Sequence, residues 1–211
     1  MHHPLKWGID LDGCLANFNR GFAERLRAKG VKLPTFTATW PEVWDWPHVY
    51  ATPEQVEATW KEVWDSAVFW KNLRPLPEVG VSGVIERLWD LEQNGHELYF
   101  LTHRQGKRVH AQSVEWLKYH LGIRHPQVLI VPGSKAKVAK ELQLDVALDD
   151  MPAVAEEYAI LAEWRPTFRP FLLARPYNAH VTHGLINRVA TVDQVIQVVM
   201  GTAAQEAMVV S

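Results

Sequence analysis

Two aspartates near the start of the chain are the first residues with an arrangement suited to chemistry. Asp10 and Asp12 follow the apolar residues of "KWGI", which begin a predicted strand, and Gly13 comes directly after them. In an extended strand, residues two apart point to the same side. Two carboxylates held together in this way repel each other and raise each other's pKa. We therefore expect the pair to have a function that offsets this electrostatic cost.

The elements that must position this pair follow from the rest of the pattern. Short apolar runs alternate with segments of helical periodicity, which predicts an α/β fold whose parallel sheet is covered by helices on both faces. The predicted strands after the first are 97–104, 127–133, 145–150 and 168–174, and the predicted helices are 84–95, 109–122, 134–143, 152–164 and 191–201. Such sheets bind ligands at the carboxyl ends of their strands.

Further polar residues lie at those predicted ends. Thr102 comes after the apolar residues "LYFL" near the end of the second strand, Asp149 and Asp150 end the fourth, and Lys135 begins the helix after the third. Several carboxylates at one edge require a neutralising cation, and oxygen ligands of this kind suit Mg²⁺. A metal, a lysine, a hydroxyl and free N–H groups at a helix start together predict a phosphate site.

Residues 31–79 interrupt the alternation. The segment 52–65 is a predicted helix, with Thr52 as N-cap, Pro53 in the first turn and Gln55 completing a capping box. The chain has ten tryptophans, many of them in this region. We predict a helical cap at 16–78, inserted between the first strand and the remainder of a core formed by 1–15 and 79–211.

Four short motifs occur in an order that resembles the haloacid dehalogenase superfamily of phosphohydrolases. They are "DLDGCL", "LT", "SK" before a helix, and "ALDD". The resemblance covers nearly the whole chain and implies a Rossmann-like core. Within the superfamily, "DLDGCLANFN", the helical insertion after it and "ARPYN" (174–178) look most like the 5′(3′)-deoxyribonucleotidase branch.

The resemblance implies a role for each motif residue. Asp10 would be the nucleophile that forms an aspartyl-phosphate, and Asp12 the general acid and then the base. Thr102 and Lys135 would hold the phosphoryl oxygens.

Magnesium ligands also follow from the resemblance. Mg²⁺ would bind Asp10, the backbone carbonyl of Asp12 and Asp149, with Asp150 as a more distant or water-mediated partner.

The resemblance further suggests where a base would bind. Phe18 matches the position of a base-stacking phenylalanine, and the opposite wall has three candidates, Trp40, Trp44 and Trp46. A flat aromatic surface suits a nucleobase. Trp60 and Trp64, four residues apart, are predicted to form the core of the cap.

Some assignments stay open at this stage. Lys137 competes with Lys135 as the phosphate ligand. His103 and Arg104 either face solvent or contact the phosphate or the substrate. Cys14, beside the aspartate pair, is predicted to pack rather than to react.

Composition excludes several classes of function. The formal net charge is −2, with 22 basic and 24 acidic residues, which gives no basic footprint for a polynucleotide. No apolar run is long enough to span a bilayer. One cysteine permits no internal disulfide and fits a reducing compartment. We therefore expect a cytoplasmic protein that binds neither a polynucleotide nor a membrane. The resemblance implies a small-molecule nucleotide substrate, and a homodimer stays open.

The sequence thus predicts a Mg²⁺-dependent phosphatase that hydrolyses (deoxy)nucleoside monophosphates. One alternative is a phosphatase of the same fold for another small ester, such as a sugar phosphate. A second alternative is a nucleotide-binding regulator without turnover. The preferred base, and the choice between 5′ and 3′ esters, stay open.

Overall fold

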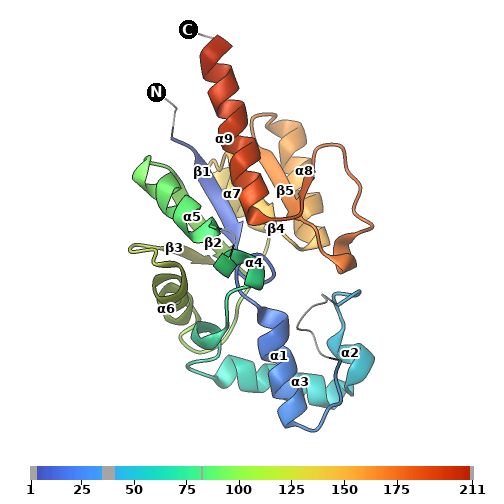
Figure 1. Cartoon of the computed structure of the whole chain (residues 1–211). Coiled ribbons are helices and arrows are strands. Elements are labelled where there is room, and N and C mark those ends of the chain that lie inside the picture. The colour runs from blue at the N-terminus through green and yellow to red at the C-terminus, as the bar shows by residue number, and fades with distance from the viewer. Residues whose placement is uncertain (1–3, 35–40, 82, 210–211) are drawn as a thin grey trace.

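The computed structural model describes residues 4–34, 41–81 and 83–209. Within them, six strands form one parallel sheet in the order β3-β2-β1-β4-β5-β6 (Figure 1). The strands are β1 Lys6–Asp10, β2 Glu97–Thr102, β3 Gln127–Ile130, β4 Val146–Asp149, β5 Arg169–Leu173 and β6 Asn187–Val189. This is the strand order of a doubly wound Rossmann sheet. The predicted fold class is confirmed.

Helices cover both faces of the sheet. Their bounds are α4 Pro77–Val81, α5 Val84–Gln93, α6 Val109–Leu121, α7 Lys135–Glu141, α8 Pro152–Trp164 and α9 Val192–Val209. Side chains of α5, α6 and α9 share one buried core with Phe100 of β2, whereas those of α7 and α8 share another with its neighbour Leu101. Adjacent strand residues face opposite sides, so the two cores lie on the two faces. Among the described residues, no helix is both long and apolar enough to cross a membrane.

The predicted elements are present, with ends that differ by a few residues. The predicted helix 152–164 coincides with α8, and the capping box of Thr52 and Gln55 is formed. The strand β6 has no counterpart among the predictions. It has three residues, two of them exposed, so it carries too few apolar positions to show a period.

A helical segment lies between β1 and β2. It contains α1 Phe18–Ala28, α2 Pro47–Tyr50, α3 Pro53–Asp65 and the short 3₁₀ helix η1 Trp70–Asn72. Figure 1 shows α1, α2 and α3 together beyond the carboxyl end of β1. The chain enters and leaves this segment side by side, because Asn17 N donates to Arg74 O and Leu76 N donates to Leu15 O, both at 2.8 Å. The division into a core and a cap at 16–78 stays a prediction.

One buried glutamine joins the helical segment to the sheet domain. Gln112 of α6 accepts a hydrogen bond from Trp70 N at 2.9 Å, and its amide nitrogen donates to Ser66 O at 2.9 Å and to Lys107 O at 2.7 Å. One turn further along α6, Trp116 Nε1 donates to Leu73 O at 2.7 Å. The segment after α3 is therefore fixed to α6 by side chains that satisfy its backbone groups.

We predict that Gln112→Ala lowers the free energy of unfolding by about 2–4 kcal/mol, because it leaves the buried Trp70 N–H and two partly buried carbonyls without their partner. Urea unfolding followed by tryptophan fluorescence measures the loss. The control is the same substitution at Gln93, which is exposed at the end of α5. Equal stability of the two variants would contradict the role given to Gln112.

Candidate active site

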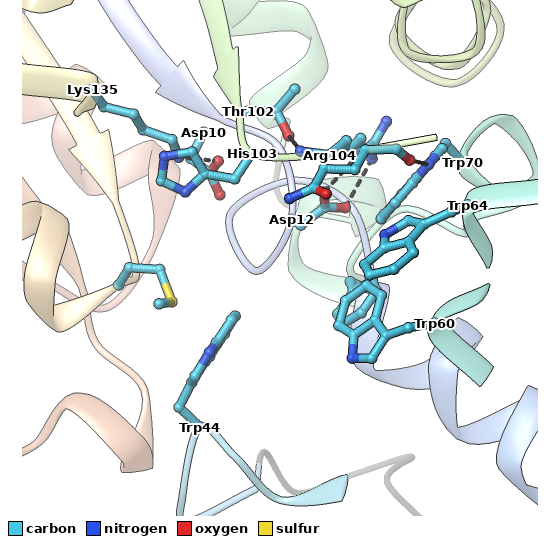
Figure 2. A pocket seen from close by; sticks show the side chains of 13 residues that line it. Asp10, Asp12, Trp44, Trp60, Trp64, Trp70, Thr102, His103, Arg104 and Lys135 are labelled. Carbon is cyan, nitrogen blue, oxygen red and sulfur yellow. Dashed lines mark hydrogen bonds and ion pairs between the residues drawn. The ribbon is translucent and has the colours of Figure 1, made fainter. Parts of the chain in front are cut away.

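The carboxyl ends of three strands and the first residue of one helix meet at the carboxyl edge of the sheet. Asp10 is the last residue of β1, Thr102 the last of β2 and Asp149 the last of β4. Lys135 is the first residue of α7. All four are buried, and Figure 2 shows Asp10, Thr102 and Lys135 together at one end of a cavity. The strand order causes this meeting, because β1 lies between β2 and β4.

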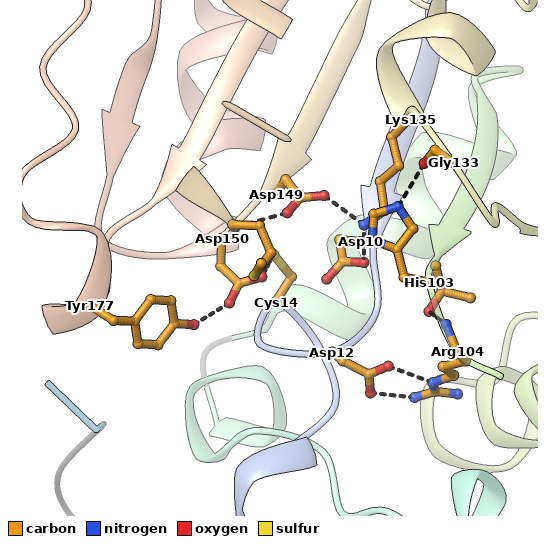
Figure 3. Close-up of polar contacts among 12 residues, drawn as sticks. Asp10, Asp12, Cys14, His103, Arg104, Gly133, Lys135, Asp149, Asp150 and Tyr177 are labelled. Atoms are coloured by element: carbon orange, nitrogen blue, oxygen red, sulfur yellow. Dashed lines mark hydrogen bonds and ion pairs between the residues drawn. The ribbon is translucent and has the colours of Figure 1, made fainter. Parts of the chain in front are cut away.

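Lys135 is the cation among these acids. Its Nζ lies 2.5 Å from Asp10 Oδ1 and 2.7 Å from Asp149 Oδ2 (Figure 3). Burial lowers the pKa of Lys135, but the two carboxylates outweigh this and raise it well above its ordinary value, so the amine is charged. Lys137 is exposed on the surface of α7. The structure thus places Lys135, and not Lys137, beside the carboxylates.

Asp150 faces Asp10 across a small space. One ligand atom each from Asp10, Cys14 and Asp150 lie within 4.8 Å of one another. The two oxygens of Asp149 instead accept hydrogen bonds from Lys135 and from Met151 N. We expected Asp149 to be the closer metal ligand and Asp150 the more distant one. Which of the two is the closer metal ligand stays a prediction; in this structure the two oxygens of Asp149 are engaged by Lys135 and Met151, and an oxygen of Asp150 lies near one of Asp10.

The donor set of this space fits Mg²⁺. Three buried carboxylates, those of Asp10, Asp149 and Asp150, gather near one lysine, and burial together with Asp149 raises the pKa of Asp150 to about 7. A divalent cation bound by oxygens would offset this excess of negative charge. Burial and the neighbouring carboxylates also raise the pKa of the Cys14 thiol well above its ordinary value. Cys14 is therefore a neutral thiol, and Asp10 and Asp150 supply the hard oxygen ligands.

Residues of the motif "ARPYN" form hydrogen bonds with Asp150 and with the turn at Gly13. The Tyr177 hydroxyl donates to Asp150 Oδ2, and Asn178 Nδ2 donates to Asp150 O at 2.8 Å. The Arg175 guanidinium donates to Gly13 O at 2.7 Å and pairs with Glu78 at 2.9 Å. We assigned no site role to these residues from the sequence. Their position directly after β5, at the edge where the other polar residues gather, was the available signal.

Asp12 is held by Arg104. The guanidinium donates from Nε to Asp12 Oδ2 at 2.7 Å and from Nη2 to Asp12 Oδ1 at 2.8 Å. Thr102 Oγ1 accepts from Arg104 N at 3.2 Å. His103 lies exposed beside them, with Nε2 3.0 Å from Gly133 O. Both candidate substrate residues after Thr102 thus border the site, but the Arg104 side chain is already paired.

The cavity next to these groups has a volume of about 320 Å³. Its inner end is polar, and its outer part is lined by aromatic rings. Figure 2 shows Trp60, Trp64 and Trp70 along one wall and Trp44 on the opposite side. The full lining is Asp10, Asp12, Phe18, Trp44, Trp60, Trp64, Trp70, Thr102, His103, Arg104, Gln105, Lys135 and Met151.

The aromatic residues predicted for the base site and for the cap core differ in how they contribute to the cavity wall. Phe18 is stacked against Trp60, with ring centroids 5.4 Å apart, and against Trp70 at 5.8 Å, so it supports the wall as part of a stack. Trp64 is 40% exposed and lines the cavity, which differs from its predicted place in the cap core. The reason is that α3 turns its Trp60–Trp64 edge toward the cavity while Val56 and Val63 are buried.

Of the three tryptophans proposed for the opposite wall, Trp44 lines the cavity and is 42% exposed. Trp46 does not line it, because its ring is buried and its Nε1 donates to Asn19 Oδ1 at 3.0 Å. Trp40 lies outside the described residues.

Comparison with known proteins identifies the family. Residues 5–205 match the sequence model of the family described as "5' nucleotidase, deoxy (Pyrimidine), cytosolic type C protein". The chain belongs to this family. It is a phosphohydrolase of the haloacid dehalogenase superfamily and resembles the deoxynucleotidase branch. No curated protein matches the chain.

Solved structures share the fold at low sequence identity. A haloacid dehalogenase-like family hydrolase from Streptococcus pneumoniae has a TM-score of 0.53 at 13% identity, covering 91% of this chain and 97% of that one. A hydrolase of the same kind from Xanthomonas campestris has a TM-score of 0.51 at 14% identity, covering 99% and 100%. A third, from Deinococcus radiodurans with bound phosphate and sodium, has a TM-score of 0.52 at 14% identity, covering 95% and 96%. These likenesses establish the fold.

The turn after Asp12 gives a direct test of the Asp150 position. Gly13 has φ +89°, and an added Cβ would lie 2.1 Å from Asp150 Oδ2. We predict that Gly13→Ala lowers the rate of phosphate release from a simple phosphate ester by about tenfold or more, since it displaces a carboxylate of the site. A colorimetric phosphate assay measures this.

The matched control is Gly30→Ala. Gly30 has φ +82°, and an added Cβ there would meet nothing within 4 Å. It therefore has the same backbone strain of about 1 kcal/mol without the contact with Asp150. Equal activities of the two variants would show that Asp150 does not need its observed position.

Proposed function

We propose that this phosphatase is Mg²⁺-dependent and hydrolyses (deoxy)nucleoside monophosphates. The observation that carries the proposal is the cavity itself, with a carboxylate and lysine group at one end and facing indoles at the other. The polar end suits a phosphoryl group, and the indoles suit a flat base. The match to a family described as a 5' nucleotidase supports the same conclusion.

The chemistry has two steps with defined proton transfers. Asp10 forms a bond from a carboxylate oxygen to phosphorus while the bond to the ester oxygen breaks, and Asp12 gives that oxygen its proton. A water oxygen then bonds to phosphorus, Asp12 takes a proton from this water, and the Asp10–phosphorus bond breaks. Both aspartates return to their starting states.

Other groups of the site stabilise the transferred group. Lys135 and Thr102 lie at the same edge as Asp10 and would hold the phosphoryl oxygens. Asp10, the backbone carbonyl of Asp12 and Asp150 would hold Mg²⁺, with Asp149 holding Lys135 in place. When bound, the ion would neutralise charge on the phosphoryl oxygens.

The outer part of the cavity determines the leaving group in this proposal. Trp44 faces Trp60 and Trp64 across the opening, so a ring can enter between them. Among the described residues that line the cavity, Gln105 is the neutral amide. A sugar would require more hydrogen-bonding partners than an aromatic slot provides, and this disfavours the sugar phosphate alternative. The word "cytosolic" in the family description supports action in the cytoplasm.

A screen of phosphate release over nucleoside monophosphates and sugar phosphates, with and without Mg²⁺, tests the proposal. We expect deoxynucleoside monophosphates to be the best substrates, and chelation of the metal to abolish turnover. Asp10→Asn should also abolish it, because the nucleophile is lost. Preference for sugar phosphates would favour the alternative ester, and nucleotide binding without release would favour a regulator.

Trp44 should matter for nucleotides only. We predict that Trp44→Ala raises KM for a nucleoside monophosphate by about tenfold or more, since one base stack contributes about 1–3 kcal/mol. Turnover of glycerol 2-phosphate, which has no ring, should stay within about twofold because it makes no such stack. Trp164→Ala is the control, since Trp164 is 84% exposed at the end of α8. Equal losses on both substrates would argue against a base slot.

A further inference from the structure

We propose that Arg104 is a positioning residue that holds Asp12 in place to serve the leaving group, and that it does not bind the phosphate. The inference rests on the proposed function in one respect, the role of Asp12 as acid and base. It goes beyond that function because it assigns the geometry of Asp12 to a second residue, 92 positions away in the sequence.

The contact between the two side chains is bidentate. Arg104 Nε and Nη2 reach the two carboxylate oxygens of Asp12 at 2.7 and 2.8 Å, as Figure 3 shows. A planar guanidinium that engages both oxygens fixes the plane of the carboxylate as well as its position. Each oxygen keeps a second lone pair, which stays available to a leaving group or a water.

Arg104 itself has little freedom to move. Its side chain is 0% exposed, whereas that of Asp12 is 17% exposed. Its third nitrogen, Nη1, donates to Ser113 Oγ at 3.1 Å. The guanidinium carbon lies 5.1 Å from the ring of Trp70 and 5.8 Å from that of Trp116, within the range of cation–π attraction.

These contacts leave the guanidinium unsuited to phosphate binding. Nε and one N–H of Nη2 are used by Asp12, one N–H of Nη1 is used by Ser113, two indoles lie against the group, and the side chain is 0% exposed. A phosphate bound in a bidentate manner at Nε and Nη2 would have to displace Asp12, the residue that must reach the leaving oxygen. The hydroxyl of Thr102 and the amine of Lys135 lie nearer to Asp10 along the strand ends and serve the phosphoryl group without this conflict.

The arrangement also links Asp12 to the helical segment. Trp70 belongs to η1, and its Nε1 donates to Gln105 O at 2.9 Å, directly after Arg104 in the chain. The backbone of Trp70 is held in turn by Gln112. Packing of the segment after α3 on the sheet domain therefore sets the position of the guanidinium, and through it that of Asp12.

The test uses two phosphate esters that differ in their leaving group. Glycerol 2-phosphate releases an alkoxide that needs a proton, whereas p-nitrophenyl phosphate releases a phenolate that does not. In single turnovers, we expect Arg104→Lys to slow glycerol release by about 10²-fold, because a misplaced acid loses its alignment with the leaving oxygen. Nitrophenolate release should be much less affected, and the half-saturating concentration of each ester in these single turnovers should stay within about twofold, since ground-state phosphate contacts are unchanged.

A double variant separates positioning from independent action. In an Asp12→Asn background, Arg104→Lys should cause no further slowing, because residues that act as one unit are non-additive. Additive losses would overturn the inference. A raised half-saturating concentration for both esters in single turnovers would also overturn it and would make Arg104 a phosphate ligand. An equal fall in both release rates would exclude a role through the proton of the leaving group.

Controls guard against a purely structural effect. Arg165→Lys alters an arginine that pairs with Asp145 at 3.0 Å, before the amino end of β4, and should leave both rates unchanged. Should Arg104→Lys fail to fold, Ser113→Ala removes the contact at Nη1 and should slow glycerol release selectively, to a smaller extent. No selectivity in the Ser113 variant would overturn the inference.

Neither ester carries a base, so the result does not depend on the preference for nucleotides. Failure of the nucleotide proposal would appear as a different substrate preference in the wild-type protein, with the effect of Arg104 intact. A wild-type protein that hydrolyses neither ester would overturn the phosphatase mechanism and this inference together. If the wild-type protein hydrolyses both esters but the variants slow glycerol release no more than nitrophenolate release, only the inference is overturned.

Discussion

The burial of Lys135 between two carboxylates is the interaction on which the site depends. Its ammonium touches Asp10 and Asp149, and all three side chains are almost fully removed from water. Burying such charges is costly unless they are paired with good geometry, and removal of one partner leaves an uncompensated charge. The central position of β1 provides this geometry, because the ends of β1 and β4 adjoin and α7 begins beside them.

The same constraint explains why a cation site lies next to the lysine. One ammonium cannot neutralise Asp10, Asp149 and Asp150 together, and the raised pKa of Asp150 reflects its burial beside another acid. Tyr177 and Asn178 hold Asp150 from the far side, and Gly13 leaves room for its carboxylate. The charged end of the cavity is thus rigid before any ligand enters, which is a requirement for electrostatic stabilisation of a reacting group.

The aromatic end of the cavity is held in place by hydrogen bonds to backbone groups and by ring packing. Its main wall is fixed to α6 by Gln112 and Trp116, which satisfy backbone groups of the segment after α3. Trp44 comes from another part of the helical segment and contacts Tyr177, the residue that supports Asp150. The two ends of the cavity are therefore connected through packed side chains.

The sequence by itself determined the sheet, the order of the polar residues along it and their meeting at one edge. Periodicity and capping are local, so α8 and the capping box of α3 were predictable, whereas the short edge strand β6 was not. Only the tertiary structure decided which of two neighbouring residues occupies each position. Asp150 faces Asp10 while Asp149 binds Lys135, Arg104 holds Asp12, and Trp44 lines the cavity while Trp46 is buried. These choices depend on side-chain direction and on contacts between residues far apart in the sequence, which residue type and spacing do not contain.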